Sequence, residues 1–271
     1  MTWAPQLEAV GRIASSEERI AQYTRLLEHA LHDTPSASLP SLVRTYVDGA
    51  VLDPVNTTGA GLLVGRHMLA HLATQLAAAH IPANILCAIV SDTLATCEAS
   101  SIMGDDELGP WRVLLAEQYA SLSRWRDAAQ ALQSITPHAA RRIPQLSFAQ
   151  LCVRVVELWL HDLPSHVAEA EQAIKRANSA ILDERDNKAL VHELWSYHAR
   201  VLAIQHRFME AAARYMDLPH ADMHAAVYAI ISPPSAQRTS MLTRLAQRAS
   251  AWPFAQTLHH AAEAVSYTHL R

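Results

Sequence analysis

Histidine is the residue type in this chain that could most readily do chemistry, since 16 of the 271 residues are histidines. His67 and His71 are four residues apart. The same spacing separates His220 from His224. On a helix, two imidazoles at this spacing point the same way and can share a metal ion such as zinc. A His-dependent metal enzyme is therefore one hypothesis for this chain.

The signatures of known enzymes are incomplete. His192 and Glu193 begin the HExxH pattern, but Ser196 stands where the second zinc ligand is needed. The sequence also contains no GxSxG motif, no glycine-rich phosphate loop and no CxxC pair. We therefore expect no catalytic residue, no metal and no cofactor, and we interpret the histidines as solvated side chains in a lysine-poor protein.

The composition favours an all-α fold. Half of the residues are apolar and 18% are charged, which is enough for a sizeable core. Alanine and leucine are abundant, whereas there are only 7 Gly and 3 Phe, a mixture that suits helices better than sheets. The formal net charge of −4 is too close to neutral to attract nucleic acid or anionic lipid.

Neither a membrane span nor a secretory signal is expected. The most apolar stretch, residues 68–90, is interrupted by His71, Pro82 and Asn84, so it is predicted to be soluble core. The first residues lack the basic start and apolar block of a signal peptide, which predicts an intracellular chain.

The three cysteines are expected to be small buried hydrophobic residues. Their number is odd, they have no metal-binding or redox spacing, and each has apolar neighbours. Cys87, Cys97 and Cys152 therefore suit a reducing compartment.

Helix signals begin near the start of the chain. Ser15 to Glu18 form a capping box, which predicts a helix over about 16–32. An apolar stripe from Leu39 to Ala50 predicts the next helix, which should end before Asp53 and Pro54 because the residue before a proline avoids the helical region.

Two more helices are expected before an acidic break. Apolar residues over 62–76 predict one helix, and Pro82 is a typical first-turn residue for the next. The acidic segment 103–110 is predicted to be a solvated turn, after which Pro110 restarts the helical pattern.

An internal repeat is the main organising feature. Its copies are residues 124–132, 165–170 and 207–215, of which the middle copy is the weakest. Each copy follows another predicted helix. Paired helices with a period of about 40 residues are typical of a solenoid, in which each pair is buried against its neighbours.

Small and aromatic residues recur in this repeat. One alanine of each copy stands at a nearly equal interval from the next, as expected where two helices cross too closely for a larger side chain. Aromatic side chains four residues before two of these alanines should cover the crossing. The residues assigned to repeat packing are Trp125, Ala129, Ala170, Phe208, Ala212 and Tyr215.

Arginines gather in two places, at Arg141 and Arg142 and again at Arg238, Arg244 and Arg248. Because no aromatic residues alternate with them, a solvated or protein-contact edge is favoured over nucleic-acid binding. We assign the second group as possible partner-contact residues.

Five sequence blocks occur in an order and at a spacing that is typical of one known family. The most recognisable block is residues 197–218, which residues 237–245 follow, and three earlier blocks lie at 23–30, 66–69 and 125–132. Together they resemble the subunit 4 family of the COP9 (constitutive photomorphogenesis) signalosome, a family of PCI-domain proteins. The resemblance covers roughly residues 16 to 260.

The resemblance implies a right-handed, tetratricopeptide-like (TPR-like) helical-repeat solenoid over residues 1–263, with its clearest repeats at 110–218. In this family a winged-helix module follows the solenoid. The final residues, 264–271, do not read like that continuation, so we expect a non-native or disordered tail on a chain truncated before the winged helix.

The resemblance also implies a function. Members of this family are non-catalytic scaffold subunits of a complex that removes a ubiquitin-like modifier from cullins. The expected partners are the other signalosome subunits and a cullin-RING ligase, and the expected location is the cytoplasm and nucleus. The alternatives are a PCI subunit of the 26S proteasome lid (non-ATPase regulatory subunit 12-like), the His-dependent metal enzyme and an unrelated tetratricopeptide-like adaptor.

Overall fold

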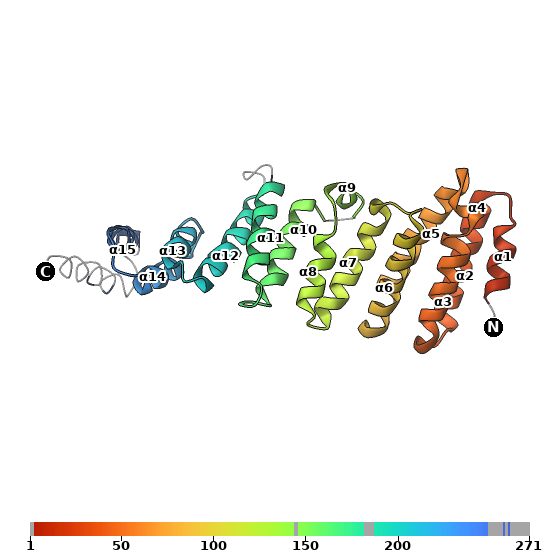
Figure 1. Ribbon diagram of the computed structural model, residues 1–271, viewed down its shortest axis with the longest axis horizontal. Coiled ribbons are helices and arrows are strands. Elements are labelled where there is room, and N and C mark those ends of the chain that lie inside the picture. The colour runs from red at the N-terminus through yellow and green to blue at the C-terminus, as the bar shows by residue number, and fades with distance from the viewer. Residues whose placement is uncertain (1–2, 144–145, 182–186, 249–256, 258–259, 261–271) are drawn as a thin grey trace. The chain divides into compact units, whose positions relative to one another are not determined.

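The computed structural model describes residues 3–143, 146–181 and 187–248, together with Thr257 and His260 (Figure 1). Over these residues the regular secondary structure is entirely helical, which confirms the all-α helical-repeat class. None of the helices in this described part is long and apolar enough to cross a membrane.

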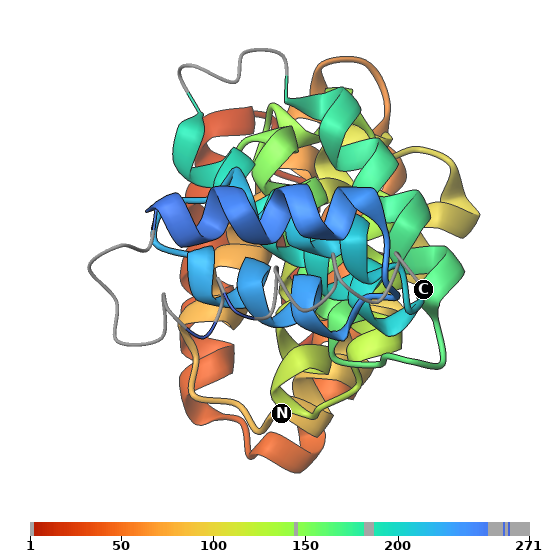
Figure 2. The ribbon, with the colours of Figure 1, turned by 90° about the vertical axis from the view of Figure 1, so that its left-hand side faces the viewer.

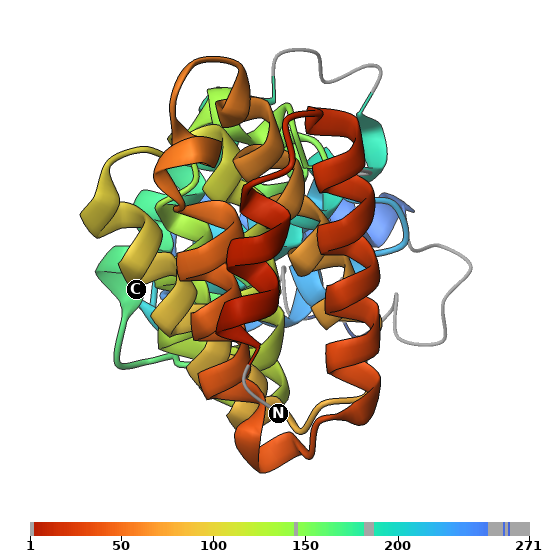
Figure 3. The ribbon, with the colours of Figure 1, turned by 90° about the vertical axis from the view of Figure 1, so that its right-hand side faces the viewer.

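The chain divides into two compact units, Met1–Leu151 and Cys152–Arg271. In the first unit, α1 packs against α2 and α3 (Figure 3), α2 packs against α5, and α3 packs against α6. Its α-helices are α1 Ala4–Gly11, α2 Ser16–Asp33, α3 Leu39–Tyr46, α4 Pro54–Thr57, α5 Leu62–Ala78, α6 Ala83–Ser100, α7 Asp105–Ser121, α8 Trp125–Gln133 and α9 Pro137–Ala140. Short 3₁₀ or π turns join some of them, at Ser36–Ser38, Val47–Val51 and Gly59–Gly61.

The second unit continues the pattern of neighbouring helices. Helix α13 packs against α12 and α14, and α14 packs against α15 (Figure 2). The helices described from residue 148 onwards are α10 Phe148–Leu160, which contains the boundary between the units, α11 Val167–Ala180, α12 Lys188–Ile204, α13 Phe208–Met216, α14 Asp222–Ile231 and α15 Ala236–Arg248. The predicted single solenoid over 1–263 stays a prediction, and residues 264–271 lie outside the described part.

The early helix predictions are confirmed. Helix α2 begins at Ser16, and the Ser15 hydroxyl accepts a hydrogen bond from the Glu18 N–H at 3.4 Å. Helix α3 runs into the π turn, which ends at Val51, before Asp53 and Pro54. Helices α5 and α6 occupy the next two predicted positions, with Pro82 directly before α6.

The predicted solvated turn at 103–110 is wrong, because α7 begins at Asp105 and contains Pro110. The start of α7 is stabilised by a Glu107 carboxylate oxygen, which accepts a hydrogen bond from the Gly104 N–H at 3.0 Å. Three consecutive acidic residues in the first turn also interact favourably with the positive end of the helix dipole. Both effects stabilise a helix start at Asp105, ahead of the proline.

Ion pairs hold this acidic turn against the rest of the first unit. The Glu107 side chain is only 7% exposed and lies 3.1 Å from both Arg66 and Arg142. Arg112 makes an ion pair with Asp105 at the same distance. Arg66 and Arg142 come from other parts of the chain and Arg112 lies two turns further along α7, so the carboxylates looked free in the sequence although they are paired.

The core of the first unit contains a buried polar group. Asn56 is fully buried, accepts a hydrogen bond from Arg19 at 3.0 Å and donates to the Ala50 carbonyl at 3.0 Å. It also donates to the Tyr23 hydroxyl at 3.3 Å. Because each buried polar atom of the Asn56 side chain has a partner, the short α4 turn is tied to α2 and to the π turn without a large desolvation cost.

One core cluster of the second unit is rich in small side chains. The alanines that share this cluster are fully or almost fully buried, and they come from α12, α13 and α14: Ala199, Ala212, Ala225, Ala226 and Ala229. Leu242 and Leu245 of α15 close the cluster. Methyl-sized side chains allow these helices to approach closely, so the packing here depends on the absence of larger residues.

Candidate functional site

The turns that precede α8 and α13, in the first and third copies of the repeat, have the same backbone structure. Ser123 and His206 both have a positive φ, of 58° and 60°. The next N–H in each turn donates across the end of the preceding helix, from Arg124 to the Tyr119 carbonyl at 2.8 Å and from Arg207 to the Leu202 carbonyl at 2.9 Å. Left-handed residues are a common way to end a helix, but two matching turns at equivalent positions show that the sequence repeat is a structural repeat.

An ion pair follows each of these turns. Arg124 pairs with Asp127 at 2.8 Å. Arg207 donates to Glu210 at 2.8 Å. In the middle copy Ser165 stands at the aligned position, and the next residue, His166, lies 3.3 Å from Glu169. The arginine and the acid three residues later therefore recur in the first and third copies.

The structure places the three recurring alanines in the interior. Ala129, Ala170 and Ala212 each have 0% exposure. Ala212 shares the alanine-rich cluster of the second unit with Ala199 and Ala226.

The aromatic residues of the repeat are less uniformly placed. Trp125 and Phe208 are half-buried, whereas Tyr215 is buried. Phe208 and Tyr215 of α13 both stack on Tyr228 of α14, with ring centroids 6.3 and 5.5 Å apart. Burial raises the pKa of the Tyr215 hydroxyl, so this ring is a neutral packing group near neutral pH.

The three arginines of α15 differ in their surroundings. Arg248 donates to the Met216 carbonyl at 3.1 Å and lies 3.6 Å from Asp222, so it ties α15 to its own unit. Arg238 is half-buried. Arg244 is exposed and has no ion pair among the described residues, which leaves its charge available at the surface.

The histidine pairs lie in different settings. His67 and His71 share α5, with His67 exposed and His71 half-buried. His220 precedes α14 in a left-handed conformation, whereas His224 lies in the helix and stacks on Tyr215. Within the described ranges, no group of three or more histidine, cysteine or acidic side chains is arranged to hold a metal ion.

The three cysteines are buried free thiols. Burial raises the pKa of the Cys97 thiol to about 11, and burial also raises the pKa of Cys87 and of Cys152. A thiol must ionise to act as a nucleophile or metal ligand, so these residues are chemically quiet near neutral pH.

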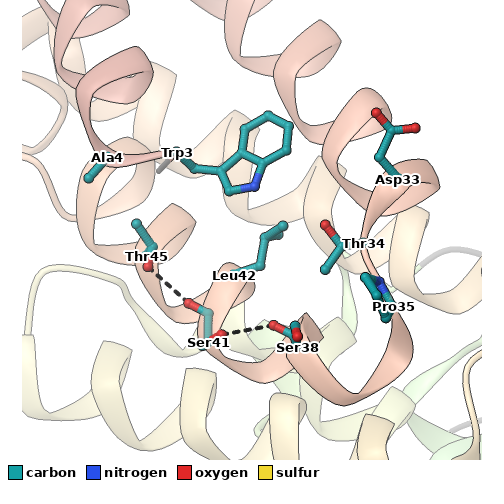
Figure 4. Close-up of a pocket in the computed structure, with 9 residues that line it drawn as sticks. All are labelled: Trp3, Ala4, Asp33, Thr34, Pro35, Ser38, Ser41, Leu42 and Thr45. Carbon is teal, nitrogen blue, oxygen red and sulfur yellow. Dashed lines mark hydrogen bonds between the residues drawn. The ribbon is translucent and has the colours of Figure 1, made fainter. Parts of the chain in front are cut away.

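A hollow of about 530 Å³ opens between the start of α1, the end of α2 and α3 (Figure 4). The Trp3 ring points into it beside Leu42. The Ser41 and Thr45 hydroxyls donate to backbone carbonyls at 2.9 Å, so neither is activated by a base. Asp33 at the rim is paired with two exposed histidines, which lower the pKa of its carboxyl group.

Sequence reasoning missed an exposed apolar surface on α14. Met223, Val227, Ile230 and Ile231 are 40–51% exposed. Their spacing of i, i+4, i+7 and i+8 places them on one side of the helix, which we call the outer stripe. The opposite side carries the buried alanines of the core, so α14 is apolar on both sides. This apolar pattern on all sides of the helix was the feature of the sequence that could have predicted the exposed surface.

Repeated helix pairs and matching turns define a helical-repeat protein. Among known proteins, the chain is 29% identical to COP9 signalosome complex subunit 4 of Caenorhabditis elegans over 260 residues. It is 25% identical to the subunits of the same name from Arabidopsis thaliana over 204 residues and from Drosophila melanogaster over 210 residues. The resemblance seen in the sequence blocks is therefore confirmed.

These similarities cover 86% of this chain for the nematode protein and 75% for each of the other two. The chain spans 63% of the length of the nematode relative and 48% of the others. No family model matches the chain.

Proposed function

We propose that this chain is a non-catalytic scaffold subunit of a COP9 signalosome-type complex and that it supports removal of the ubiquitin-like modifier from cullins through protein contacts. The observation that carries the proposal is the similarity to three subunit 4 proteins over at least three quarters of this chain. Its partners are the other signalosome subunits and a cullin-RING ligase, in the cytoplasm and nucleus.

The arrangement of the described residues supports a scaffold role. Ionisable groups in the repeat are used in structural ion pairs, as between Arg207 and Glu210, and the buried cysteines are held as neutral thiols. Stacked helix pairs instead offer long surfaces to partners. A PCI subunit of the proteasome lid is the second candidate, because its helical architecture is of the same kind.

Arg244 is the strongest partner-contact candidate within this proposal. It is exposed and lies on a helix that carries three arginines and no acidic residue. Arg238 and Arg248 share this helix, and Arg248 also fixes its position through Met216 and Asp222. A rim charge of this kind acts mainly on the rate and specificity of association.

Affinity capture of the tagged chain from its own cells tests the proposal. We expect signalosome subunits to be enriched over proteasome-lid subunits when the captured proteins are quantified by mass spectrometry. Arg244→Glu should lower recovery of the signalosome subunits by several-fold, whereas Arg126→Glu, at another exposed arginine, should not. Enrichment of lid subunits alone would favour the second candidate and overturn the first.

A further inference from the structure

The hollow between α1, α2 and α3 is lined by hydrogen-bond acceptors. The Ser41 hydroxyl donates its hydrogen to the Ser38 carbonyl, and the Thr45 hydroxyl donates to the Ser41 carbonyl, each at 2.9 Å. Because both hydroxyl hydrogens are used, the two oxygens can serve a ligand only as acceptors. Asp33 is the charged residue among the nine described residues that line the hollow. The polar part of the lining therefore suits a ligand that donates hydrogen bonds.

Asp33 carries a negative charge near neutral pH. A hydrogen bond from His32 lowers the pKa of its carboxyl group, and the nearby His29 lowers it further. The ring nitrogens of His29 and His32 lie 2.8 and 3.1 Å from the two carboxylate oxygens. The histidine side chains are 73% and 89% exposed, so these contacts are weak and a better donor can replace them. The carboxylate is thus available to a cation.

The Trp3 ring gives the same hollow an aromatic wall. The Trp3 carbonyl accepts hydrogen bonds from the N–H groups of Gln6 and Leu7 at 3.1 Å, which fixes the residue at the start of α1. Its half-buried ring packs against the core of the first unit and points into the hollow beside Leu42 (Figure 4). The face of an indole ring attracts a cation through its quadrupole.

We propose that this hollow binds the arginine side chain of a partner protein, with the guanidinium group stacked on Trp3 and donating hydrogen bonds to Asp33. A guanidinium group is planar and carries five N–H donors, so it can stack on an aromatic ring and donate from its edge at the same time. The hollow, at about 530 Å³, is within the size range of ligand pockets and has room for one such side chain.

Other occupants fit this lining less well. A phosphorylated or acidic side chain would be repelled by Asp33, and it would find the hydroxyl hydrogens of Ser41 and Thr45 already used. An apolar side chain would leave the Asp33 carboxylate without a new partner. A lysine ammonium group carries the charge but cannot stack as a plane on the ring. The inference concerns the first unit alone and does not depend on the proposed function.

Titration of the full chain with N-acetyl-arginine amide tests the proposal. The indole N–H signals of the six tryptophans can be followed by NMR, and the Trp3 signal is assigned by its loss in Trp3→Phe. We expect the Trp3 signal to shift in a saturable way. N-acetyl-citrulline amide has nearly the same shape but no charge, and it should bind more weakly by roughly three-fold or more.

A charge-removing variant gives the second arm of the test. Asp33→Asn should weaken binding of the arginine amide by roughly three-fold and leave binding of the citrulline amide unchanged. The matched control is Glu28→Gln, which removes an exposed acid of α2 that does not line the hollow and should change neither. Unchanged signals from the other five tryptophans show that each variant keeps its fold.

Four outcomes would overturn the proposal. Equal binding of the arginine and citrulline amides would make the hollow a neutral site. Tighter binding of N-acetyl-lysine amide would make it an ammonium site. Equal effects of Asp33→Asn and Glu28→Gln would indicate a general attraction between a cation and an acidic surface. The absence of any saturable shift at Trp3 would show that arginine does not enter the hollow.

Discussion

His198 shows how single residues in this protein serve the fold. It lies in α12, where burial lowers its pKa below the ordinary value of 6.5, and the nearby charges of Arg214 and Arg207 lower it further. Glu171 and Glu210 oppose this shift without cancelling it. The imidazole is therefore kept neutral in the folded protein under conditions where an exposed histidine would begin to bind a proton.

This shift predicts a pH dependence of stability. As the pH falls below about 6.5, the unfolded chain binds a proton at His198 before the folded chain does, so the free energy of unfolding should fall until the pH reaches the folded-state pKa. His198→Gln should weaken this decline in urea titrations between pH 7.5 and 5.5. His67→Gln, at an exposed histidine, serves as the control, and equal effects of the two changes would contradict the assignment.

At the scale of elements, much of the fold can be predicted from local signals. The Ser15 cap, the proline positions and the apolar periodicity placed α2, α3, α5 and α6 correctly. The error at α7 arose because its acidic first turn is stabilised by Arg66 and Arg142, which are distant in the sequence, as well as by Arg112 two turns along the same helix. Ion pairs of this kind leave no pattern in the neighbouring sequence. An acidic helix start and an acidic solvated turn therefore have similar sequences.

The close crossing of helices at α13 predicts that two neighbouring alanines differ in how much stability is lost when each is replaced by leucine. Ala212 is fully buried, so Ala212→Leu should lower the free energy of unfolding by about 1–3 kcal/mol through overpacking. Ala213 is exposed, and Ala213→Leu should change it by less than about 0.5 kcal/mol. Chemical denaturation of both variants measures the difference, and similar losses would show that the crossing tolerates larger side chains.

At the scale of the whole molecule, the repeat was visible in the sequence because its turns and crossings demand particular residue types. The ion pairs after the turns, such as Arg124 with Asp127, and the small residues at the crossings recur with it. The outer stripe of α14 was missed because, in the sequence alone, its exposed apolar residues look the same as residues of the core. Only the packing of neighbouring helices shows which side is already covered.

The proposed scaffold role separates the chain from the chemistry of its complex. Contacts made by helix faces can position other subunits without any reacting group in this chain. The captured complex should then carry an activity that the isolated chain lacks.

Cleavage of a cullin that carries its ubiquitin-like modifier is the most direct measurement of this claim. The purified chain alone and the complex captured through it should be assayed side by side, at equal concentrations of the chain. We predict that the captured complex releases the modifier and that the isolated chain does not. Release by the isolated chain, or no release by a captured complex that contains the other subunits, would contradict the account.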